Sequence, residues 1–387
     1  MSFPVIFLTR APFSSDDDIH SGGSPVSDAA FSAGPDTPAA GSFFGAASYF
    51  VPGHITGFFE IADNDDPHRK GSRGCGIVPD KGLTTTVRAI PAKNAAASFP
   101  VDVFLNGRPV PGRIVKSVLS LMDLPKDRPY RLEVSGKADL PVGCGFGMSA
   151  AGALGTAFAA NALFGLDHSR AELVEIAHVA EVTNGSGLGD VAGCSSGGLV
   201  LREVPGGSRY GVFRRLDAPP KKLFCRVLGP LDTSSVLSDP GRAERIRVTG
   251  RAAMSAFLKD PSFWSFMDVS LDFSKEVGLM SDDARAAVSA LDPSLAKASQ
   301  AMLGNTVFAV TADFSGMTDD PAQIEEYERS AERHIEETLG RYGDVIVCRI
   351  GFPTPVPAAG SVSGTDAASG TDAASGTDAA SSDPPSL

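Results

Sequence analysis

Apolar and polar residues alternate in short runs over much of the chain, and longer stretches with helical spacing lie between these runs. Alternation with a period of two is typical of half-buried strands, whereas spacings of three and four are typical of helices packed on a core. The alternating runs predict strands at Ala47–Val51, Phe58–Ala62, Thr84–Ile90, Val101–Leu105, Tyr130–Val134, Gly198–Val204, Lys222–Leu228, Val307–Ala312 and Val345–Ile350. The helical patterns cover Ser149–Leu166, Ser169–Thr183, Gly241–Leu258, Asp282–Leu291 and Ala322–Tyr342. Because strands and helices intermingle without regular alternation, we predict the α+β class.

Both ends of the chain lack such patterns. Residues Thr9 to about Gly45 are rich in Ser, Gly, Pro, Asp and Ala, and SGTDAA repeats three times from Ser363. Segments of small and acidic residues bury too little apolar area to offset the entropy lost on folding. We therefore predict disordered segments at 1–45 and 353–387. A boundary near Ala218–Pro220 divides the remainder into an N-terminal domain at 46–218 and a C-terminal domain at 219–352.

Charge, cysteine content and hydrophobicity indicate which partners and which cell compartment to expect. Lys plus Arg number 34 against 46 Asp plus Glu, and the net charge of -12 argues against a nucleic-acid partner, which would need a basic surface. Five cysteines without a C-x-x-C pair indicate a reduced, intracellular protein. The uncharged stretch Ala150–Leu166 is short for a bilayer and rich in Ala and Gly, so we interpret it as a buried helix rather than a membrane span. Together these features predict a cytoplasmic protein with no membrane partner.

The strongest chemical signal is PVGCGFGMSAAG, from Pro141 to Gly152, between a predicted strand and a long apolar helix. Gly143, Gly145 and Gly147 let the backbone adopt positive φ and approach a ligand closely. The helix that begins near Ser149 directs unpaired N–H groups and a partial positive charge back at this segment. The pattern therefore indicates an anion site, although a glycine-rich turn packing a helix on a sheet would have a similar sequence.

A second signal is AEVTNGSGLGDVAGCSSGG, from Ala180 to Gly198. Glu181 ends an amphipathic helix for which Ser169 is a plausible N-cap, and Asp190 follows in a glycine-punctuated loop. Phosphoryl transfer needs neutralisation of charge and one group that orients or deprotonates the nucleophile, which an acidic pair can supply. A helix-ending Glu and an Asp in an ordinary turn remain the alternative.

The order P-x-x-x-G-x-G-x-S-x-A from Pro141 resembles the phosphate-binding motif of the GHMP kinases. Phe146 and Met148 depart from the commoner form, but the glycines and Ser149 are kept. The resemblance implies ATP as phosphate donor and a two-domain fold, with an N-terminal domain like domain 2 of ribosomal protein S5 and a helix-rich α+β C-terminal domain. It implies that Glu181 binds Mg²⁺ together with Ser149 and that Asp190 is the catalytic carboxylate. It further implies an ATP loop formed by Pro141, Gly143, Gly145, Gly147, Met148, Ser149 and Ala150.

Three further segments are more specific. PGHITGFFEI from Pro52, KGSRGCGI from Lys70 and AMLGNTVFAV from Ala301 resemble the archaeal-type pantoate kinases. The last segment stands where other GHMP kinases carry a G-x-G-G-G string, which is absent here. The resemblance covers about Tyr49 to Phe352 and implies ATP-dependent phosphorylation of pantoate to 4-phosphopantoate in coenzyme A biosynthesis, by a cytoplasmic enzyme that forms a homodimer.

A pantoate site needs a cation for the carboxylate, a polar donor and an apolar wall. We expect Arg202, at the end of the apolar strand GGLVLR, to bind the carboxylate through two oxygens. The alternative for Arg202 is a strand-end arginine in solvent. His54 and Arg73 are further candidates: His54 contacts a substrate oxygen or is a turn histidine that caps its own backbone, and Arg73 contacts the substrate or a triphosphate oxygen. Other acceptors such as mevalonate or homoserine remain open, as does a ligand sensor without turnover; a sensor would be expected to lose the acidic pair.

Overall fold

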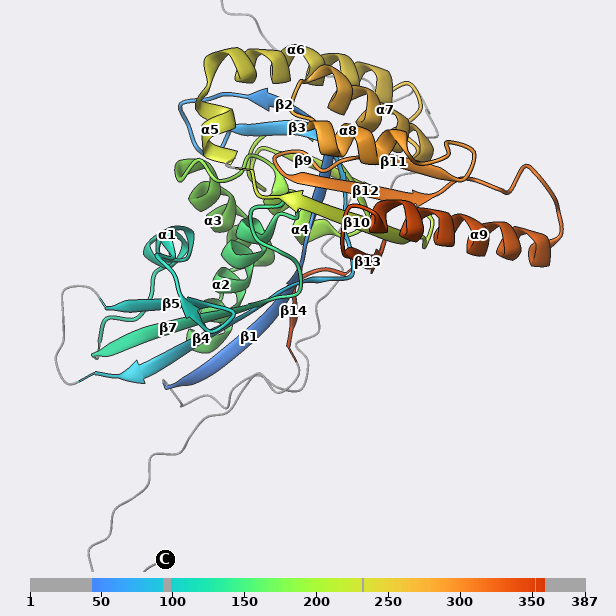
Figure 1. The fold of residues 1–387 in the computed structure, drawn as a ribbon. Coiled ribbons are helices and arrows are strands. Elements are labelled where there is room, and N and C mark those ends of the chain that lie inside the picture. The colour runs from blue at the N-terminus through green and yellow to red at the C-terminus, as the bar shows by residue number, and fades with distance from the viewer. Residues whose placement is uncertain (1–43, 93–98, 128, 232, 352, 359–387) are drawn as a thin grey trace, which may run out of the picture.

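The computed structural model describes residues 44–92, 99–127, 129–231, 233–351 and 353–358. Within these ranges helices and sheets intermingle without regular alternation, which confirms the predicted α+β class (Figure 1). The helices of the described part are α1 (Arg113–Leu121), α2 (Met148–Phe164), α3 (Arg170–Thr183), α4 (Asp190–Ser196), α5 (Thr233–Ser238), α6 (Pro240–Phe257), α7 (Phe263–Glu276), α8 (Asp282–Ser289) and α9 (Pro321–Gly340). None of them is long and apolar enough to cross a membrane.

A six-stranded sheet supports the N-terminal part of the chain. In spatial order it contains β14 (Val356–Pro357), β1 (Gly45–Pro52), β4 (Gly82–Pro91), β7 (Tyr130–Ala138), β5 (Val101–Leu105) and β6 (Arg108–Pro109). All neighbours are antiparallel except β5 and β7. Helix α2 packs on β1 and β4, and it approaches β4 so closely that a Cβ at Gly155 would lie 2.5 Å from Thr85 Oγ1. The small residues of α2 therefore make a buried core helix, as predicted.

A second sheet lies beneath α6 and α7 (Figure 1). Its antiparallel order is β2 (Ile55–Ala62), β3 (Gly71–Ile77), β8 (Leu199–Val204) and β9 (Val212–Leu216). The Phe58 ring of β2 packs 5.3 Å from that of Phe257 on α6 and 6.3 Å from that of Phe266 on α7, centroid to centroid. These apolar contacts join residues from both sides of residue 218 into one core. The division into two domains at that residue stays a prediction.

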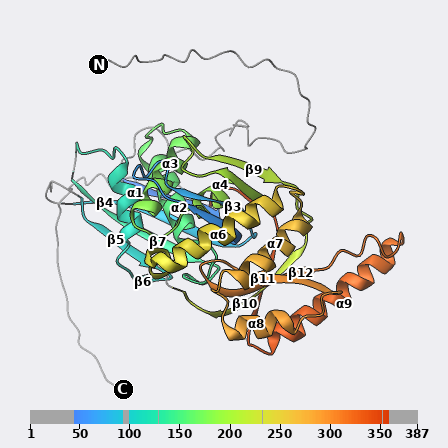
Figure 2. The same cartoon turned by 90° about the horizontal axis from the view of Figure 1, so that it is seen from above.

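The third sheet belongs to the C-terminal half. Its order is β11 (Ala296–Gln300), β12 (Asn305–Thr311), β10 (Lys222–Gly229) and β13 (Val345–Arg349), all antiparallel. Helix α9 packs on β12 and β10, and Figure 2 shows this helix extending outward from the body of the protein. Helix α7 contacts both β2 and β11, so it connects the second and third sheets.

Several elements depart from the predictions. β3 contains three glycines and therefore lacks the alternation that identifies a strand, while Asp190, predicted in a loop, is the first residue of the short helix α4. The predicted C-terminal tail began too early, because Val356 and Pro357 pair with β1 at Phe50 and Tyr49. The rest of the predicted tails, 1–43 and 359–387, lies outside the described residues. The other unpredicted elements are α1, α5, α7, β6, β9 and β11.

Candidate active site

The glycine-rich segment 141–147, called here the glycine loop, connects β7 to the first turn of α2. Gly143, Gly145 and Gly147 have φ values of 76°, 91° and 64°, as the sequence predicted for these residues. Gly147 is the N-cap of α2 and has no side chain to satisfy the first N–H groups of the helix. The loop therefore leaves backbone donors, and the positive end of α2, available to an anion.

Two distant segments hold the glycine loop from either side. The backbone N–H of His54 donates to the Phe146 carbonyl at 2.9 Å, and the Thr306 hydroxyl donates to the Cys144 carbonyl at 2.7 Å. A Cβ at Gly304 would collide with the backbone of Cys144, so only glycine allows this approach. The segments PGHIT and MLGNT thus fix the shape of the loop.

A cleft of about 360 Å³ opens over the glycine loop. Five of the seven predicted ATP-binding residues line it, namely Gly143, Gly145, Gly147, Met148 and Ser149. Ala150 is fully buried in α2, and Pro141 lies before the part of the loop that faces the cleft. Asp190 lines the same cleft. The structure therefore brings the glycine loop, Ser149 and Asp190 to one place.

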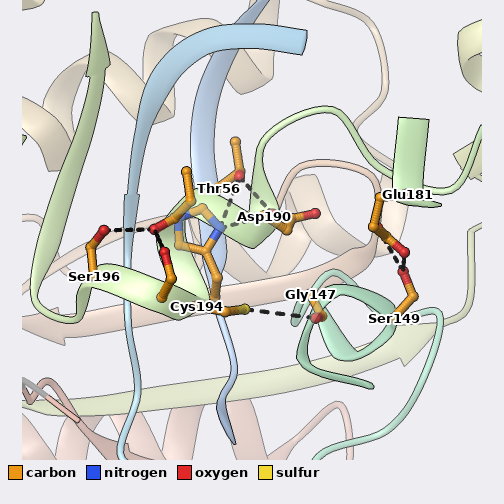
Figure 3. A network of polar contacts seen from close by, with 10 residues as sticks. Thr56, Gly147, Ser149, Glu181, Asp190, Cys194 and Ser196 are labelled. Carbon is orange, nitrogen blue, oxygen red and sulfur yellow. Dashed lines mark hydrogen bonds and ion pairs between the residues drawn. The ribbon is translucent and has the colours of Figure 1, made fainter. Parts of the chain in front are cut away.

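Glu181, near the end of α3, is directed at the start of α2. Its carboxylate accepts hydrogen bonds from the Ser149 hydroxyl at 2.8 and 3.0 Å (Figure 3). The Ser186 hydroxyl donates to the same carboxylate at 2.9 Å. Glu181 is only 1% exposed, and this burial raises its pKa to about 7 despite the two hydroxyl donors. The group is thus an oxygen-only cluster whose carboxyl can be neutralised by either a proton or a cation.

Asp190, in contrast to Glu181, has an imidazole and a hydroxyl as partners and a nearby arginine. His54 Nδ1 is 2.8 Å from its Oδ1, and the Thr56 hydroxyl donates to the same oxygen at 3.2 Å. Burial acts to raise the pKa of Asp190, but the contact with His54, the charge of Arg202 and the Thr56 hydrogen bond together hold it below its ordinary value. The carboxylate remains 26% exposed. Asp190 is therefore ionised at neutral pH and open to the cleft, which suits a group that acts on a substrate hydroxyl.

Arg202 on β8 lies behind Asp190 and is 1% exposed. Its partner in the register with β3 is Gly74, where a Cβ would lie 2.9 Å from Arg202 Nη2, so glycine makes room for the guanidinium. In the described part of the chain, neither Nε nor Nη1 of Arg202 has a hydrogen-bond partner. Burial lowers its pKa although the Asp190 carboxylate acts in the opposite direction. The guanidinium borders a cavity that Ser72 and His178 also line and that is too narrow in this structure to admit a water molecule.

Two predicted substrate residues are placed away from a direct contact. Arg73 is on the opposite face of β3 from Gly74, and it bonds to the Glu203 carbonyl at 3.0 Å and to Glu60 at 3.3 Å. The structure therefore does not bring Arg73 to the cleft, a correction to its predicted role. His54 is fully buried behind Asp190, so the structure places it as a partner of that carboxylate rather than at the cleft surface.

Several residues that complete the site were not singled out from the sequence. Thr56 and Ser186 bond to the two carboxylates, and Ser72 and His178 line the cavity at Arg202. Arg113, the first residue of α1, adds an exposed cation to the cleft. Ser72, Thr56 and Ser186 stand inside the quoted motifs, so their motif membership was the available signal. His178 lies within a predicted helix and Arg113 in the unpredicted helix α1, and neither residue carried such a signal.

A family profile, related sequences and a solved structure all match kinases or phosphotransferases. The sequence profile of the "GHMP kinases N terminal domain" matches residues 113–198. The chain is 37% identical over 262 residues to a pantoate kinase of Methanospirillum hungatei, covering 67% of this chain and 86% of that protein. It is 36% identical to a pantoate kinase of Thermococcus kodakarensis, with coverages of 68% and 87%. A solved structure described as a phosphotransferase related to the CoA biosynthesis pathway superposes with a TM-score of 0.68 at 29% identity, covering 81% of this chain and 98% of that one.

Proposed function

Since the chain belongs to the GHMP kinase family and, within it, to the pantoate kinases, we propose that it transfers the γ-phosphoryl group of ATP to a hydroxyl of pantoate, giving 4-phosphopantoate for coenzyme A biosynthesis in the cytoplasm. The observation that supports this best is that the glycine loop, Ser149 and the ionised Asp190 line one cleft, with Glu181 buried directly behind Ser149. The donor and acceptor halves of a phosphoryl transfer are both represented there.

The donor half is built to hold polyphosphate. The backbone N–H groups of the glycine loop and the N-terminus of α2 bind phosphate oxygens without adding a titratable group. Ser149 and Glu181 offer the oxygen ligands that Mg²⁺ prefers. Among the described residues no cluster of three or more His, Cys, Asp or Glu could hold a metal unaided, which fits a cation whose remaining ligands come from the nucleotide phosphates and water. Bound there, Mg²⁺ would neutralise phosphate charge.

The acceptor half begins at Asp190. Its carboxylate accepts a hydrogen bond from the substrate hydroxyl and so aligns the oxygen with the γ-phosphorus. The bond from this oxygen to phosphorus forms while the bond from phosphorus to the bridging oxygen of ADP breaks. The hydroxyl proton passes to the carboxylate or through it to water. Because the low pKa keeps Asp190 ionised, the carboxylate is ready to act without a prior proton loss.

The substrate carboxylate is assigned to Arg202. Its guanidinium is buried with two nitrogens unpartnered in the described part of the chain, and a carboxylate that enters as the narrow cavity widens satisfies both of them. Ser72 lines the same cavity and adds a hydroxyl for a second oxygen, whereas His178, which also lines it, holds Nε2 2.9 Å from the Lys70 carbonyl. No Asp or Glu lines that cavity, so it offers no counter-charge to an amino group. This favours a hydroxy acid over an amino acid such as homoserine.

The proposal is tested by ADP release over pantoate, pantothenate, mevalonate, homoserine and shikimate, with the product of each active acceptor identified by mass spectrometry. Pantoate is expected to give the highest kcat/KM. The Asp190→Asn variant serves as the control, and it should lose most of the turnover. Turnover of mevalonate or homoserine without turnover of pantoate would contradict the acceptor assignment and leave the family unchanged.

A further inference from the structure

His54 occupies a closed compartment behind Asp190. The residue has no exposed surface, and its Nδ1 lies 2.8 Å from Asp190 Oδ1. An ionised carboxylate can only accept hydrogen bonds, so Nδ1 carries the proton and donates. Burial holds the pKa of His54 below its ordinary value, which keeps the imidazole neutral and leaves Nε2 without a proton.

Two glycines form the walls of this compartment. A Cβ at Gly76 on β3 would collide with His54 Nε2, and a Cβ at Gly193 on α4 would collide with Cδ2 of the same ring. In the described part of the chain, Nε2 has no hydrogen-bond partner, as expected of an imidazole edge that faces glycine backbone. The ring therefore has little room to rotate or shift, and its Nδ1 faces Asp190 Oδ1 at 2.8 Å, with the Thr56 hydroxyl 3.4 Å away from the same nitrogen.

The backbone of His54 is tied to the other half of the site. Its N–H donates to the Phe146 carbonyl of the glycine loop, and a Cβ at Gly147 would lie only 3.2 Å from the His54 carbonyl oxygen. One residue thus contacts both the loop that would hold the phosphates and the carboxylate that would meet the hydroxyl. Figure 3 shows the second oxygen of Asp190 directed away from this hydrogen bond, toward the side where Ser149 and Glu181 lie.

We propose that His54 is a positioning residue, which sets the place and orientation of the Asp190 carboxylate relative to the glycine loop. The inference rests on the proposed function, because it concerns how Asp190 is aligned for phosphoryl transfer. His54 does not touch the substrate; its Nδ1–H occupies Oδ1, so that the other carboxylate oxygen is presented to the acceptor hydroxyl. Alignment of the attacking oxygen with the phosphorus is sensitive to shifts of about 1 Å, so a loosened Asp190 slows the transfer itself.

Two substitutions separate this role from a contact with substrate. His54→Leu fills a similar space without a donor, whereas His54→Asn retains an amide N–H that can reach the position of Nδ1. We expect His54→Leu to lower kcat by about 10- to 100-fold while the KM values for ATP and acceptor stay within about threefold. His54→Asn should recover most of the lost kcat. A rise in acceptor KM with unchanged kcat would overturn the inference, as would equal losses in both variants while circular dichroism and thermal unfolding show both to be folded.

The double variant tests whether His54 acts through Asp190. Because the proposed effect requires the carboxylate, adding His54→Leu to Asp190→Asn should lower kcat by less than about threefold. A further loss as large as in the wild-type background would show an independent role and overturn the inference.

A measurement without substrate keeps this test separate from the identity of the acceptor. In protein labelled with ¹⁵N-histidine, long-range nitrogen–proton correlation spectra should show His54 as the neutral Nδ1–H tautomer, assigned by its loss in His54→Asn. An Nε2–H tautomer or a charged imidazole at neutral pH would contradict the inference. If pantoate were not phosphorylated but the Nδ1–H tautomer were found, the acceptor assignment would fail and the contact of His54 with Asp190 would stand.

Discussion

At the scale of single residues, the site places two carboxyl groups on consecutive helices and gives them opposite environments. Among the described residues Glu181 has hydroxyl donors and no cation in hydrogen-bond contact, so burial dominates and raises its pKa to about 7. Asp190 has an imidazole partner and the charge of Arg202 nearby, which outweigh burial. Two neighbouring carboxyl groups whose pKa values diverge can take different roles in a site. At neutral pH Asp190 is ionised, whereas Glu181 is partly protonated unless a cation replaces the proton.

The raised pKa of Glu181 predicts a pH-dependent loss of stability. Its folded pKa of about 7 exceeds the ordinary value of 4.5, so its contribution is complete below pH 4.5 and is lost as pH rises through 7. Relative to Glu181→Gln, the wild-type free energy of unfolding should fall by about 2–3 kcal/mol from pH 5 to pH 8. Urea unfolding without Mg²⁺ or nucleotide measures this difference. An identical difference at both pH values would show that Glu181 titrates normally.

Substitutions of Asp190 and of Arg202 should affect different kinetic constants. Asp190→Asn removes a group that acts mainly in the transition state, so kcat should fall strongly while the pantoate KM stays within a few-fold. Arg202→Ala removes a charge partner present before and during transfer, so the pantoate KM should rise by the equivalent of roughly 2–4 kcal/mol. Arg73→Ala, on the other face of the same sheet, is the matched control and should change neither constant. Steady-state kinetics with ATP saturating distinguishes these outcomes, and interchangeable effects of the first two variants would refute the assignment.

Ser149, Glu181 and Asp190 could be singled out from the sequence because each stands in a compact motif. The cavity at Arg202 could not be predicted from the sequence, because its polar residues come from three separate elements: Ser72 from β3, His178 from α3 and Arg202 from β8. The pairing of β3 with β8 brings Ser72 and Arg202 together, and this pairing cannot be inferred from the spacing of residues along the chain. Arg73 was misplaced for a related reason: β3 was not predicted, so the alternation that sends Ser72 and Arg73 to opposite faces was not applied.

At the scale of elements, the sequence predicted correctly those features that depend only on residues close together in the chain, such as a helix cap. Ser169 is the N-cap of α3, as predicted, and it forms a capping box with Glu172, in which the Ser169 N–H donates to Glu172 Oε2 at 2.8 Å. Elements whose character depends on a neighbour were missed. β3 is a strand because β2 and β8 supply its hydrogen bonds on both sides, and α7 buries serines such as Ser270 that weaken its apolar pattern.

The capping box gives a prediction at this scale. Ser169→Ala leaves N–H groups at the start of α3 without their side-chain acceptor, and should lower the free energy of unfolding by about 1 kcal/mol. Ser255→Ala within α6 is the control, because that hydroxyl bonds to the carbonyl one turn earlier and caps no helix end. Equilibrium urea unfolding of both variants provides the comparison. Equal changes would mean that the box adds nothing beyond an ordinary surface serine.

At the scale of the whole molecule, the three sheets are held together by apolar contacts that cross the predicted domain boundary, and by a final strand that returns to the first. The Ala358 N–H donates to the Ser48 carbonyl at 2.9 Å, next to the pairing of β14 with β1. The edge of β1 is therefore covered by residues that the sequence pattern had assigned to a tail.

Truncation tests where the folded part ends. A chain ending at Gly360 retains β14, and it should keep its stability and activity because the removed repeats have no core-forming pattern. A chain ending at Pro355 loses β14 and leaves the edge of β1 unpaired, so its free energy of unfolding should fall by about 1–2 kcal/mol and it should aggregate more readily. Thermal unfolding and light scattering compare the two. Indistinguishable behaviour would show that β14 contributes nothing.

The pairing of β1 with β14 also bears on how the protein is made. A ribosome delivers β1 before every other described element and its outer neighbour β14 only after all of them. During that interval the exposed main-chain groups of β1 can accept a strand from another nascent chain. The outer edge of β1 is therefore the last part of this sheet to be covered as the chain is made.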